Sequence, residues 1–445
     1  MESTPENWLE FSAGQNTKAN LLRFKSNIYL SFGKQIFGFL FFLIKSYGIK
    51  SLKTPKNDVL FFASTSNQYS VLNSIYKEHT KFKAAFAIPN AASKKFNTKD
   101  TNPYYLRISF IYIFPVLLLL LRRLFPLLKI LWQTDRRLIF LRLNSFLQIY
   151  YWLIAHQVFL EKMQPKVVIM SNDHNPENRT LIEICKYFDI KTAYVPHASV
   201  SDRFHSLDFN YSFLDGQHAL DIYKKCDSRR APNSMIIDKR LCYLVGNLRK
   251  LEVKKNNLNQ SKKFGLAVKG TDNINNIIYI ISKLSAIYPV SIRPHPSLKF
   301  NKPFHILDKK FPGLVELSDP HSDSVSSFLS SIDIFVSGNT TLSLEAASAE
   351  IYPVYLNELS NNVNDYYGFV KRKIVHYFDT IDDFIIFHNK GNLFLPDKNG
   401  INHYWSSYNR PTFGNEAKII SNYLRKIVDS SYKLPSNYSI YNETL

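Results

Sequence analysis

The chain has 445 residues, enough for two or three domains at about 150 residues each. Lys and Arg outnumber Asp and Glu by 56 to 36, a net charge of +20, and hydrophobic residues make up 45%. These values exclude a chain that is disordered throughout. Three cysteines without zinc-site spacing exclude a disulfide framework and favour a reducing compartment. The first residues lack a basic start followed by an apolar run, so we expect no signal peptide.

The positive charge predicts an anionic partner, which could be nucleic acid, a membrane surface or a phosphorylated substrate. The sequence shows no zinc-finger spacing, no basic helix leading into a heptad repeat and no aromatic RNA-binding strand. We therefore expect no nucleic acid among the partners.

The first half reads as alternating strands and helices around a long apolar region. Residues 58–65 and 82–90 are predicted strands, with a helix between them, and residues 103–160 are predicted to form long helices. Strands are then predicted at 166–170, 191–195, 209–214 and 242–246, with a helix from Pro176.

An apolar, uncharged run at 108–121 predicts contact with a membrane. It has 14 residues where a span needs about 20, and Pro115 and Pro126 should kink a helix, so we expect it not to cross the bilayer. We expect the region 103–145 to lie among anionic headgroups, and 36–44 is a weaker second candidate; buried core helices are the alternative for both. The cations predicted to contact lipid are Arg122, Arg123, Arg136 and Arg137.

The second half repeats the alternation after a polar, basic linker at 247–263. Strands are predicted at 264–270, 290–297, 314–318, 334–338 and 351–357, with helices at 273–288, 321–333 and 339–349. This spacing predicts doubly wound parallel sheets. We expect one domain over 1–246, a second over 264–414, and a helix with a tail over 415–445 that packs back on the first domain.

Ligands of open parallel sheets bind beyond the carboxyl ends of the strands. In the second half these ends carry cations, hydroxyls and small residues before a helix start, a set that suits a phosphate group. A simple helix cap and a rigid proline loop are the alternatives. The predicted nucleotide-binding residues are Lys269, Gly270, Arg293, His295, Pro296, Ser297, Ser337, Gly338, Thr340, Thr341 and, for ribose hydroxyls, Glu345.

The strand ends of the first half supply the acid-base candidates Asp173 and His197. Histidine titrates near neutrality, and a nearby carboxylate raises its basicity. The alternatives are a helix N-cap for Asp173 and a turn for His197. Arg179 and Arg203 are weaker candidates for anion contacts.

The second-half pattern of strand–RPHPS, strand–SGNTTLSLEA and IYPVYLN resembles the nucleotide-binding domain of GT-B glycosyltransferases. It is most similar to bacterial capsule and lipopolysaccharide enzymes with a His-Pro motif and a later Ser/Thr motif. These are sialyltransferases, Kdo transferases and teichoic-acid glycerophosphotransferases, and the strand–VPHASVS of the first half resembles their strand–QHG loop. The resemblance implies two Rossmann-like domains facing a cleft, an acceptor-binding domain over 1–246 and a nucleotide-sugar-binding domain over 264–414. It also implies that His295 contacts the donor phosphate, with Ser337, Thr340 and Thr341 beside it.

The sequence contains no G-x-x-x-x-G-K-[ST], no G-x-G-x-x-G and no Asp-x-Asp motif. We therefore expect a metal-independent reaction without a cofactor, in which cations meet the charge of the leaving group. With the resemblance, this predicts an inverting transferase of sialic acid or Kdo from a CMP-linked donor to a capsule or lipopolysaccharide acceptor. It would work in the cytoplasm, at the inner face of a bacterial membrane. A CDP-glycerol-type polyol-phosphate transferase and a non-catalytic membrane scaffold are the alternatives.

Overall fold

The computed structural model divides into two compact units. The N-terminal unit is Met1–Leu248 with Asn409–Leu445, and the C-terminal unit is Arg249–Tyr408. Thr271, Ser297, Arg203, the tail beyond 429 and most of the predicted linker lie outside the described residues. The structure describes 30–48, 56–79, 81–90, 101, 103–173, 175–200, 204, 206–227, 241–248, 262–270, 272–296, 298, 307, 310–360, 364–391 and 396–429.

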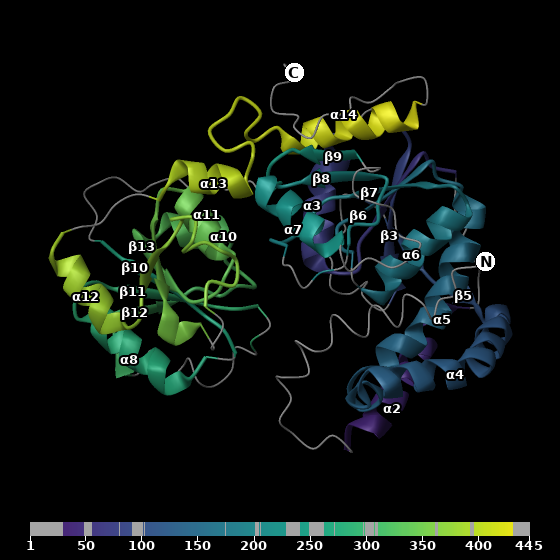
Figure 1. Cartoon of the computed structure of the whole chain (residues 1–445), viewed down its shortest axis with the longest axis horizontal. Coiled ribbons are helices and arrows are strands. Elements are labelled where there is room, and N and C mark those ends of the chain that lie inside the picture. Colours follow the sequence, from purple (N-terminus) through teal and green to yellow (C-terminus); the bar gives the residue numbers. More distant parts are fainter. Residues whose placement is uncertain are drawn as a thin grey trace. The chain divides into compact units, whose positions relative to one another are not determined.

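The N-terminal unit is built on a seven-stranded parallel sheet in the order β4-β3-β2-β6-β7-β8-β9 (Figure 1). Its central strands, β2 and β6, are apolar and fully buried, because helices cover both faces of a parallel sheet. The strands are β2 (Val59–Phe62), β3 (Ala84–Pro89), β4 (Tyr104–Leu106), β6 (Val167–Met170), β7 (Lys191–Tyr194), β8 (Tyr211–Leu214) and β9 (Leu241–Leu244).

The edge strand β4 corrects the prediction of helix from residue 103. Tyr104 and Tyr105 favour strand structure, and they pair with Ala87 and Ile88 of β3. A run of three residues is too short to show a strand periodicity in the sequence.

Helices cover both faces of this sheet. The helices α3 (Ser66–Lys77) and α14 (Glu416–Val428) share one apolar cluster with it, and α5 (Arg137–Met163), α6 (Pro176–Tyr187) and α7 (Gln217–Cys226) share the other. Figure 1 shows α14 lying along the sheet, although it is the last helix of the chain. Its buried Ile420 and Leu424 complete the core of the N-terminal unit.

A helical layer lies beside this sheet and contains the segment with predicted membrane contact. The helices α2 (Leu30–Ser46) and α4 (Ile113–Asp135) both pack on α5, and the short strands β1 (Tyr47–Gly48) and β5 (Ile108–Ser109) pair beside them. A 3-10 turn, Phe110–Tyr112, leads into α4.

The helix α4 extends well beyond the 14-residue uncharged run, so the length argument against a membrane span does not hold. The stretch Phe110–Gln133 has 24 residues, enough by length and composition to cross a membrane. Its most apolar 18-residue window has a mean hydropathy of 2.0, and 17% of that window is buried. The helix continues through Pro126 because Leu127 and Leu131 pack in the core beyond it. Arg122 and Arg123 fall at the middle of this stretch, where a charge costs roughly 2.5–3.5 kcal/mol in a span.

The C-terminal unit has a six-stranded parallel sheet in the order β12-β11-β10-β13-β14-β15. The chain builds outward from β10 to β12 and then returns to place β13 beside β10, so the strand order reverses between β10 and β13. The strands are β10 (Phe264–Val268), β11 (Val290–Pro294), β12 (Val315–Leu317), β13 (Ile334–Ser337), β14 (Tyr352–Leu356) and β15 (His376–Phe378).

The helices of the C-terminal unit also lie on both faces. One face carries α8 (Ile274–Ser285) and α12 (Ile381–Asn389), and the other carries α10 (Val325–Ser330), α11 (Leu342–Ser348) and α13 (Lys398–Tyr404). Side chains alternate between these clusters along β13, with Val336 facing α8 and Phe335 facing α10. A 3-10 turn, Asn357–Leu359, follows β14.

Candidate functional site

A small cavity opens at the carboxyl ends of β10, β11 and β13, where the strand order reverses. Its volume is about 150 Å³. This is the position at which open α/β sheets bind ligands. Gly270 lies beside it, and Ser297 is outside the described residues. The predicted residues that line the cavity are Lys269, Arg293, His295, Pro296, Ser337, Gly338, Thr340, Thr341 and Glu345.

The loop after β10 is held by Asp272. Its carboxylate accepts a hydrogen bond of 2.7 Å from the backbone N–H of Lys269, and its own N–H donates to the Lys269 carbonyl at 3.1 Å. This reciprocal pair fixes the turn that places the Lys269 side chain on the cavity wall. Gly270 is exposed at the turn.

Arg293 is 7% exposed and is largely committed to the protein itself. Its Nη1 donates to Ser318 Oγ at 2.8 Å, its Nη2 donates to the Asp323 carbonyl at 2.9 Å, and its guanidinium lies over the Phe328 ring. Burial lowers the pKa of Arg293, against the opposing charges of Asp323 and Glu345. Arg293 therefore fixes the loop after β12 and adds positive charge to the cavity wall. The two hydrogen bonds use two of its five N–H donors.

His295 stands at the exposed rim of the cavity, directly after β11. Its backbone N–H donates to the Val268 carbonyl at 2.9 Å, which joins the ends of two neighbouring strands. Partial burial, together with the ammonium of Lys269, lowers the pKa of His295 below its usual 6.5. The ring is therefore neutral at pH 7, and a bound anion would favour its protonation.

The turn after β13 supplies hydroxyl groups. Ser337 Oγ and Ser343 Oγ lie 3.0 Å apart, and Thr340 Oγ1 accepts a hydrogen bond from the Leu342 N–H at 3.3 Å. The helix α11 begins at Leu342 and not at 339 as predicted, and it has seven residues. The dipole of so short a helix is small, so the cations and hydroxyls carry the charge complementarity of the cavity.

The segment that follows β14 also shapes the cavity, and it was not predicted from the sequence. Asn339 donates to the Ser360 carbonyl at 3.2 Å, and its Oδ1 accepts from the Tyr355 hydroxyl and from the Tyr366 N–H. A Cβ on Gly338 would overlap the carbonyl oxygen of Leu359, so only glycine allows this close approach. Leu359 thereby forms one wall of the cavity.

Glu345 is 4% exposed and lines the cavity from the first turn of α11. Its charge acts on Arg293. A buried carboxylate at this place can accept hydrogen bonds from the hydroxyls of a bound ligand.

In the N-terminal unit, Asp173 is fully buried. The Tyr223 hydroxyl donates to its Oδ2 at 2.8 Å and lies 3.0 Å from the Tyr194 hydroxyl. Burial, and then the charge of Asp173, raise the pKa of both tyrosines well above 10. The N-cap of α6 is Asn175, so the alternative of a cap at Asp173 is wrong, and this geometry makes Asp173 a buried hydrogen-bond acceptor.

His197 is half-buried after β7, and its Nδ1 hydrogen-bonds the carbonyl of Ser171. A carbonyl only accepts, so Nδ1 carries the proton and the lone pair lies on Nε2. This tautomer is the one that a general base needs.

The strand order of this sheet reverses between β2 and β6. Buried polar residues lie on the segments that follow these two strands: Gln68 in α3, Ser171 directly after β6, and Asn178 and Arg179 in α6. Among the described residues, the amide of Asn178, Nε2 of Gln68, Oγ of Ser171 and Nη1 of Arg179 have no hydrogen-bond partner. Buried polar atoms are normally paired, so these groups mark a second candidate binding position. Of the four, only Arg179 was singled out in the sequence.

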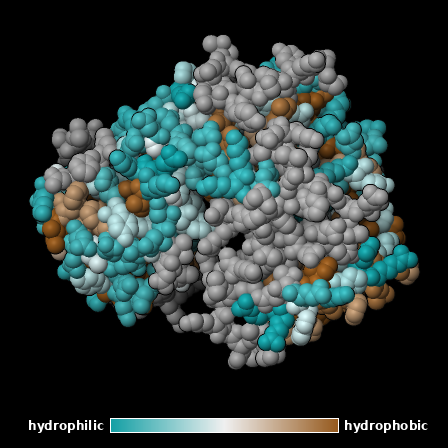
Figure 2. Space-filling view, in the orientation of Figure 1, coloured by the Kyte–Doolittle hydropathy of each residue, from teal (hydrophilic) through white to brown (hydrophobic). Residues whose placement is uncertain are grey.

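The predicted membrane cations lie on an apolar surface. Arg122, Arg136 and Arg137 are exposed, and Arg123 is half-buried. Leu121 and Phe125 of α4 are 76% and 77% exposed. Figure 2 shows hydrophobic surface over the helical layer. Its other exposed members include Phe37, Leu40, Phe41 and Ile44 of α2 and Ile111, Phe114 and Trp132 around α4.

No protein-family model and no curated protein matches the sequence. A Listeria monocytogenes protein assigned as a UDP-N-acetylglucosamine 2-epimerase aligns with 86% of this chain and 99% of its own, at 9% identity and a TM-score of 0.54. The UDP-bound MnaA of S. aureus aligns with 84% of this chain and 97% of its own, at 11% identity and a TM-score of 0.50. The chain contains two doubly wound parallel-sheet units and is similar in structure to these two proteins along most of its length. It therefore has the GT-B fold.

Proposed function

We propose that the protein is a glycosyltransferase that takes a sugar from a nucleotide-activated donor. The observation that carries this proposal is the cavity at the β10–β13 reversal, where Lys269, His295 and Thr340 meet. Cations and hydroxyls at this position of an α/β sheet suit a nucleotide phosphate. The fold neighbour that holds UDP gives independent support for a nucleotide ligand.

The cavity is suited to the phosphate and ribose of the donor. Its volume of about 150 Å³ is below the ~300–1,000 Å³ typical of sites that enclose a whole ligand. Lys269 and His295 would contact the phosphate, and Glu345 would accept hydrogen bonds from ribose hydroxyls. The base and the sugar would lie against other residues.

The reaction is a displacement at the anomeric carbon of the sugar. An acceptor hydroxyl attacks this carbon, the bond to the phosphate oxygen breaks, and the nucleotide leaves with the electron pair. Nε2 of His197 would take the hydroxyl proton, while Lys269 and protonated His295 would stabilise the leaving phosphate without a metal. Asp173 would hold Tyr223 and Tyr194 in place instead of acting as the base. Inversion and a CMP-linked donor of sialic acid or Kdo rest on the sequence resemblance.

We further propose that the acceptor is a capsule or lipopolysaccharide glycan at the inner face of a bacterial membrane. The exposed apolar side chains and arginines of α4 support a helix lying in the headgroup region. The buried polar groups of Asn178 and Arg179, which have no partner among the described residues, would bind the glycan.

Liposome flotation tests the membrane proposal. Each arginine near an anionic surface contributes about 1 kcal/mol, or roughly fivefold in binding. Binding to anionic vesicles should therefore fall strongly when four arginines are changed to Gln: Arg122, Arg123, Arg136 and Arg137. The matched control makes the same charge change at exposed lysines elsewhere: Lys371, Lys390, Lys398 and Lys418. Equal loss in both variants would refute a specific membrane surface.

Product analysis tests the reaction and separates the alternatives. The full chain is incubated with a panel of nucleotide sugars and CDP-glycerol, with and without bacterial glycolipid, and products are identified by mass spectrometry. Sugar in the glycolipid supports a glycosyltransferase, and glycerol phosphate there supports the polyol-phosphate alternative. An altered sugar without acceptor indicates an epimerase, and no turnover of any donor indicates a scaffold.

The His197→Asn variant tests the assigned base. It should lose transfer by at least a hundredfold while nucleotide affinity stays unchanged. His321→Asn, at an exposed position outside the cavity, serves as the control and should keep full activity. Full transfer by His197→Asn would remove His197 from the mechanism.

A further inference from the structure

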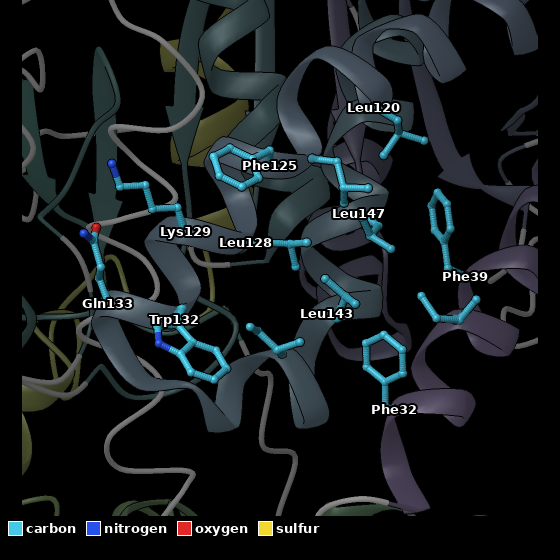
Figure 3. Close-up of a pocket in the computed structure, with 13 residues that line it drawn as sticks. Phe32, Phe39, Leu120, Phe125, Leu128, Lys129, Trp132, Gln133, Leu143 and Leu147 are labelled. Atoms are coloured by element: carbon cyan, nitrogen blue, oxygen red, sulfur yellow. The ribbon is translucent and has the colours of Figure 1, made fainter.

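An apolar groove of about 800 Å³ runs between α2, α4 and α5 in the helical layer. Figure 3 shows Phe32 and Phe39 of α2 on one side, facing leucines of α4 and α5. Apart from Lys129 and Gln133, every residue that lines it is apolar. Its size matches sites that enclose a whole ligand.

The groove is an open binding surface and not a flaw in the packing of the core. Protein interiors have few voids larger than a water molecule. Leu143 and Leu147 form a buried floor, whereas Phe125 and Trp132 on its walls are 77% and 60% exposed. Apolar walls on a hollow of this size favour a hydrocarbon ligand over a polar one.

The polar groups lie where the headgroup of such a ligand would be. Lys129 and Gln133 are one turn apart on α4, and their polar ends point away from the apolar side chains (Figure 3). Arg122 and Arg136 are exposed on the segment that flanks them. The surface therefore complements an amphiphile with an apolar chain and an anionic headgroup.

We propose that this groove binds one hydrocarbon chain of a membrane lipid that carries a phosphate headgroup. The chain lies on the leucine floor, and Lys129 contacts the phosphate. The proposal rests on the proposed function at the membrane, and it implies that the glycan acceptor is linked to a lipid of this chemical class.

Trp132 makes the proposal testable without a membrane, because it lines the groove. The full chain is titrated with a brominated single-chain alkyl phosphate below its critical micelle concentration, and tryptophan quenching is measured. Quenching should saturate at one molecule per chain and disappear in Trp132→Phe. Affinity should rise about fourfold with each added methylene until the groove is full, and then stop rising.

Matched variants separate the groove from the rest of the apolar surface. Leu124→Gln, on the groove wall, should weaken chain binding about tenfold, whereas Leu121→Gln, exposed outside the groove, should not change it. Lys129→Gln should reduce the preference for a phosphate over an uncharged headgroup about fivefold. The same charge change at Lys390, which is exposed in the C-terminal unit and outside the groove, should leave this preference unchanged.

Three results would overturn the proposal: quenching that persists in Trp132→Phe, affinity that keeps rising with chain length, or equal effects of Leu124→Gln and Leu121→Gln. The assay contains no donor, so it is independent of transfer. If the alkyl phosphate binds but no donor is turned over, the lipid-binding proposal stands and the proposed transferase function is wrong. If a donor is turned over but the alkyl phosphate does not bind, the transferase function stands and the lipid-binding proposal is wrong.

Discussion

At the scale of single residues, anion binding in the cavity at the ends of β10, β11 and β13 depends on the positions of its charged side chains and on the space around Gly338. Lys269 and His295 follow the neighbouring strands β10 and β11, and the charge of Lys269 lowers the pKa of His295. Arg293 is held by hydrogen bonds within the protein. We therefore expect a bound phosphate to change the charge of His295, at the rim of the cavity, more than that of Arg293.

His295 should take up a proton when a nucleotide binds. Its pKa is lowered in the empty site by partial burial and by Lys269, and a phosphate nearby would raise it. Affinity should therefore increase as pH falls through the pKa of the complex, and level off below the pKa of the free site. Calorimetry near pH 6.5 in two buffers of different ionisation enthalpy measures the uptake.

The His295→Asn variant isolates this proton from those of the phosphate itself. It should bind more weakly and take up fewer protons than the wild type at the same pH. Identical proton uptake by both proteins would place His295 away from the ligand.

Gly338 should be essential for nucleotide binding for a steric reason. In Gly338→Ala the new Cβ meets the backbone carbonyl of Leu359, which cannot move without the segment that Asn339 holds. We expect loss of nucleotide binding or of the folded C-terminal unit, seen by calorimetry and circular dichroism. In the comparison variant Gly270→Ala, the Cβ meets only the flexible end of Leu298, so binding should largely survive. Equal behaviour of the two variants would contradict this reading.

Residues at strand ends could be predicted from the sequence, but their partners could not. Buried apolar runs mark parallel strands, and the polar residues after them must meet at one edge. The burial of Asp173 depends on Tyr223, 50 residues away, and the place of Asn339 depends on Tyr355 and Tyr366. No local pattern contains such contacts.

At the scale of elements, α5 holds the two parts of the N-terminal unit together. It packs on α2 and α4 on one side and on α6 and the sheet on the other. His156 lies at this contact, fully buried, stacked on Trp152, with its Nε2 2.9 Å from the Glu177 carbonyl of α6.

His156 should make the α5–α6 contact sensitive to acid. Burial lowers its pKa to about 3, so between about pH 6.5 and 3 the unfolded state binds a proton that the folded state does not. Stability is therefore lost as pH falls below 6.5, by about 2–3 kcal/mol at pH 4.5. Hydrogen exchange of the α5 and α6 amides at pH 7.5 and 4.5 measures this loss, and His156→Gln should reduce it. If His156→Gln loses as much stability between pH 7.5 and 4.5 as the wild type, other groups cause the acid sensitivity.

The length of α4 shows why a charge pair misleads a sequence reading. The apolar run was taken to end at Arg122, yet the helix continues to Asp135. Arginine side chains carry their charge outward on apolar stems, so they interrupt a hydropathy run without ending a helix.

At the scale of the whole molecule, the chain leaves the N-terminal unit, builds the C-terminal unit and returns as α14. The alternation of strands and helices was sufficient to predict two doubly wound sheets. The strand β15 and the helix α12 were not predicted, because they lie beyond the last recognised motif.

The account depends on nucleotide binding by the C-terminal unit. Calorimetry of the full chain with CMP, CDP, UDP and GDP tests this, using Lys269→Met and, as a charge-matched control outside the cavity, Lys390→Met. We expect a pyrimidine nucleotide to bind to the wild type and to Lys390→Met equally. Lys269→Met should bind at least tenfold more weakly, because a hydrogen bond to a charged group contributes about 1.5–3 kcal/mol. Absence of nucleotide binding by the wild type, or equal affinity of the two variants, would contradict the account.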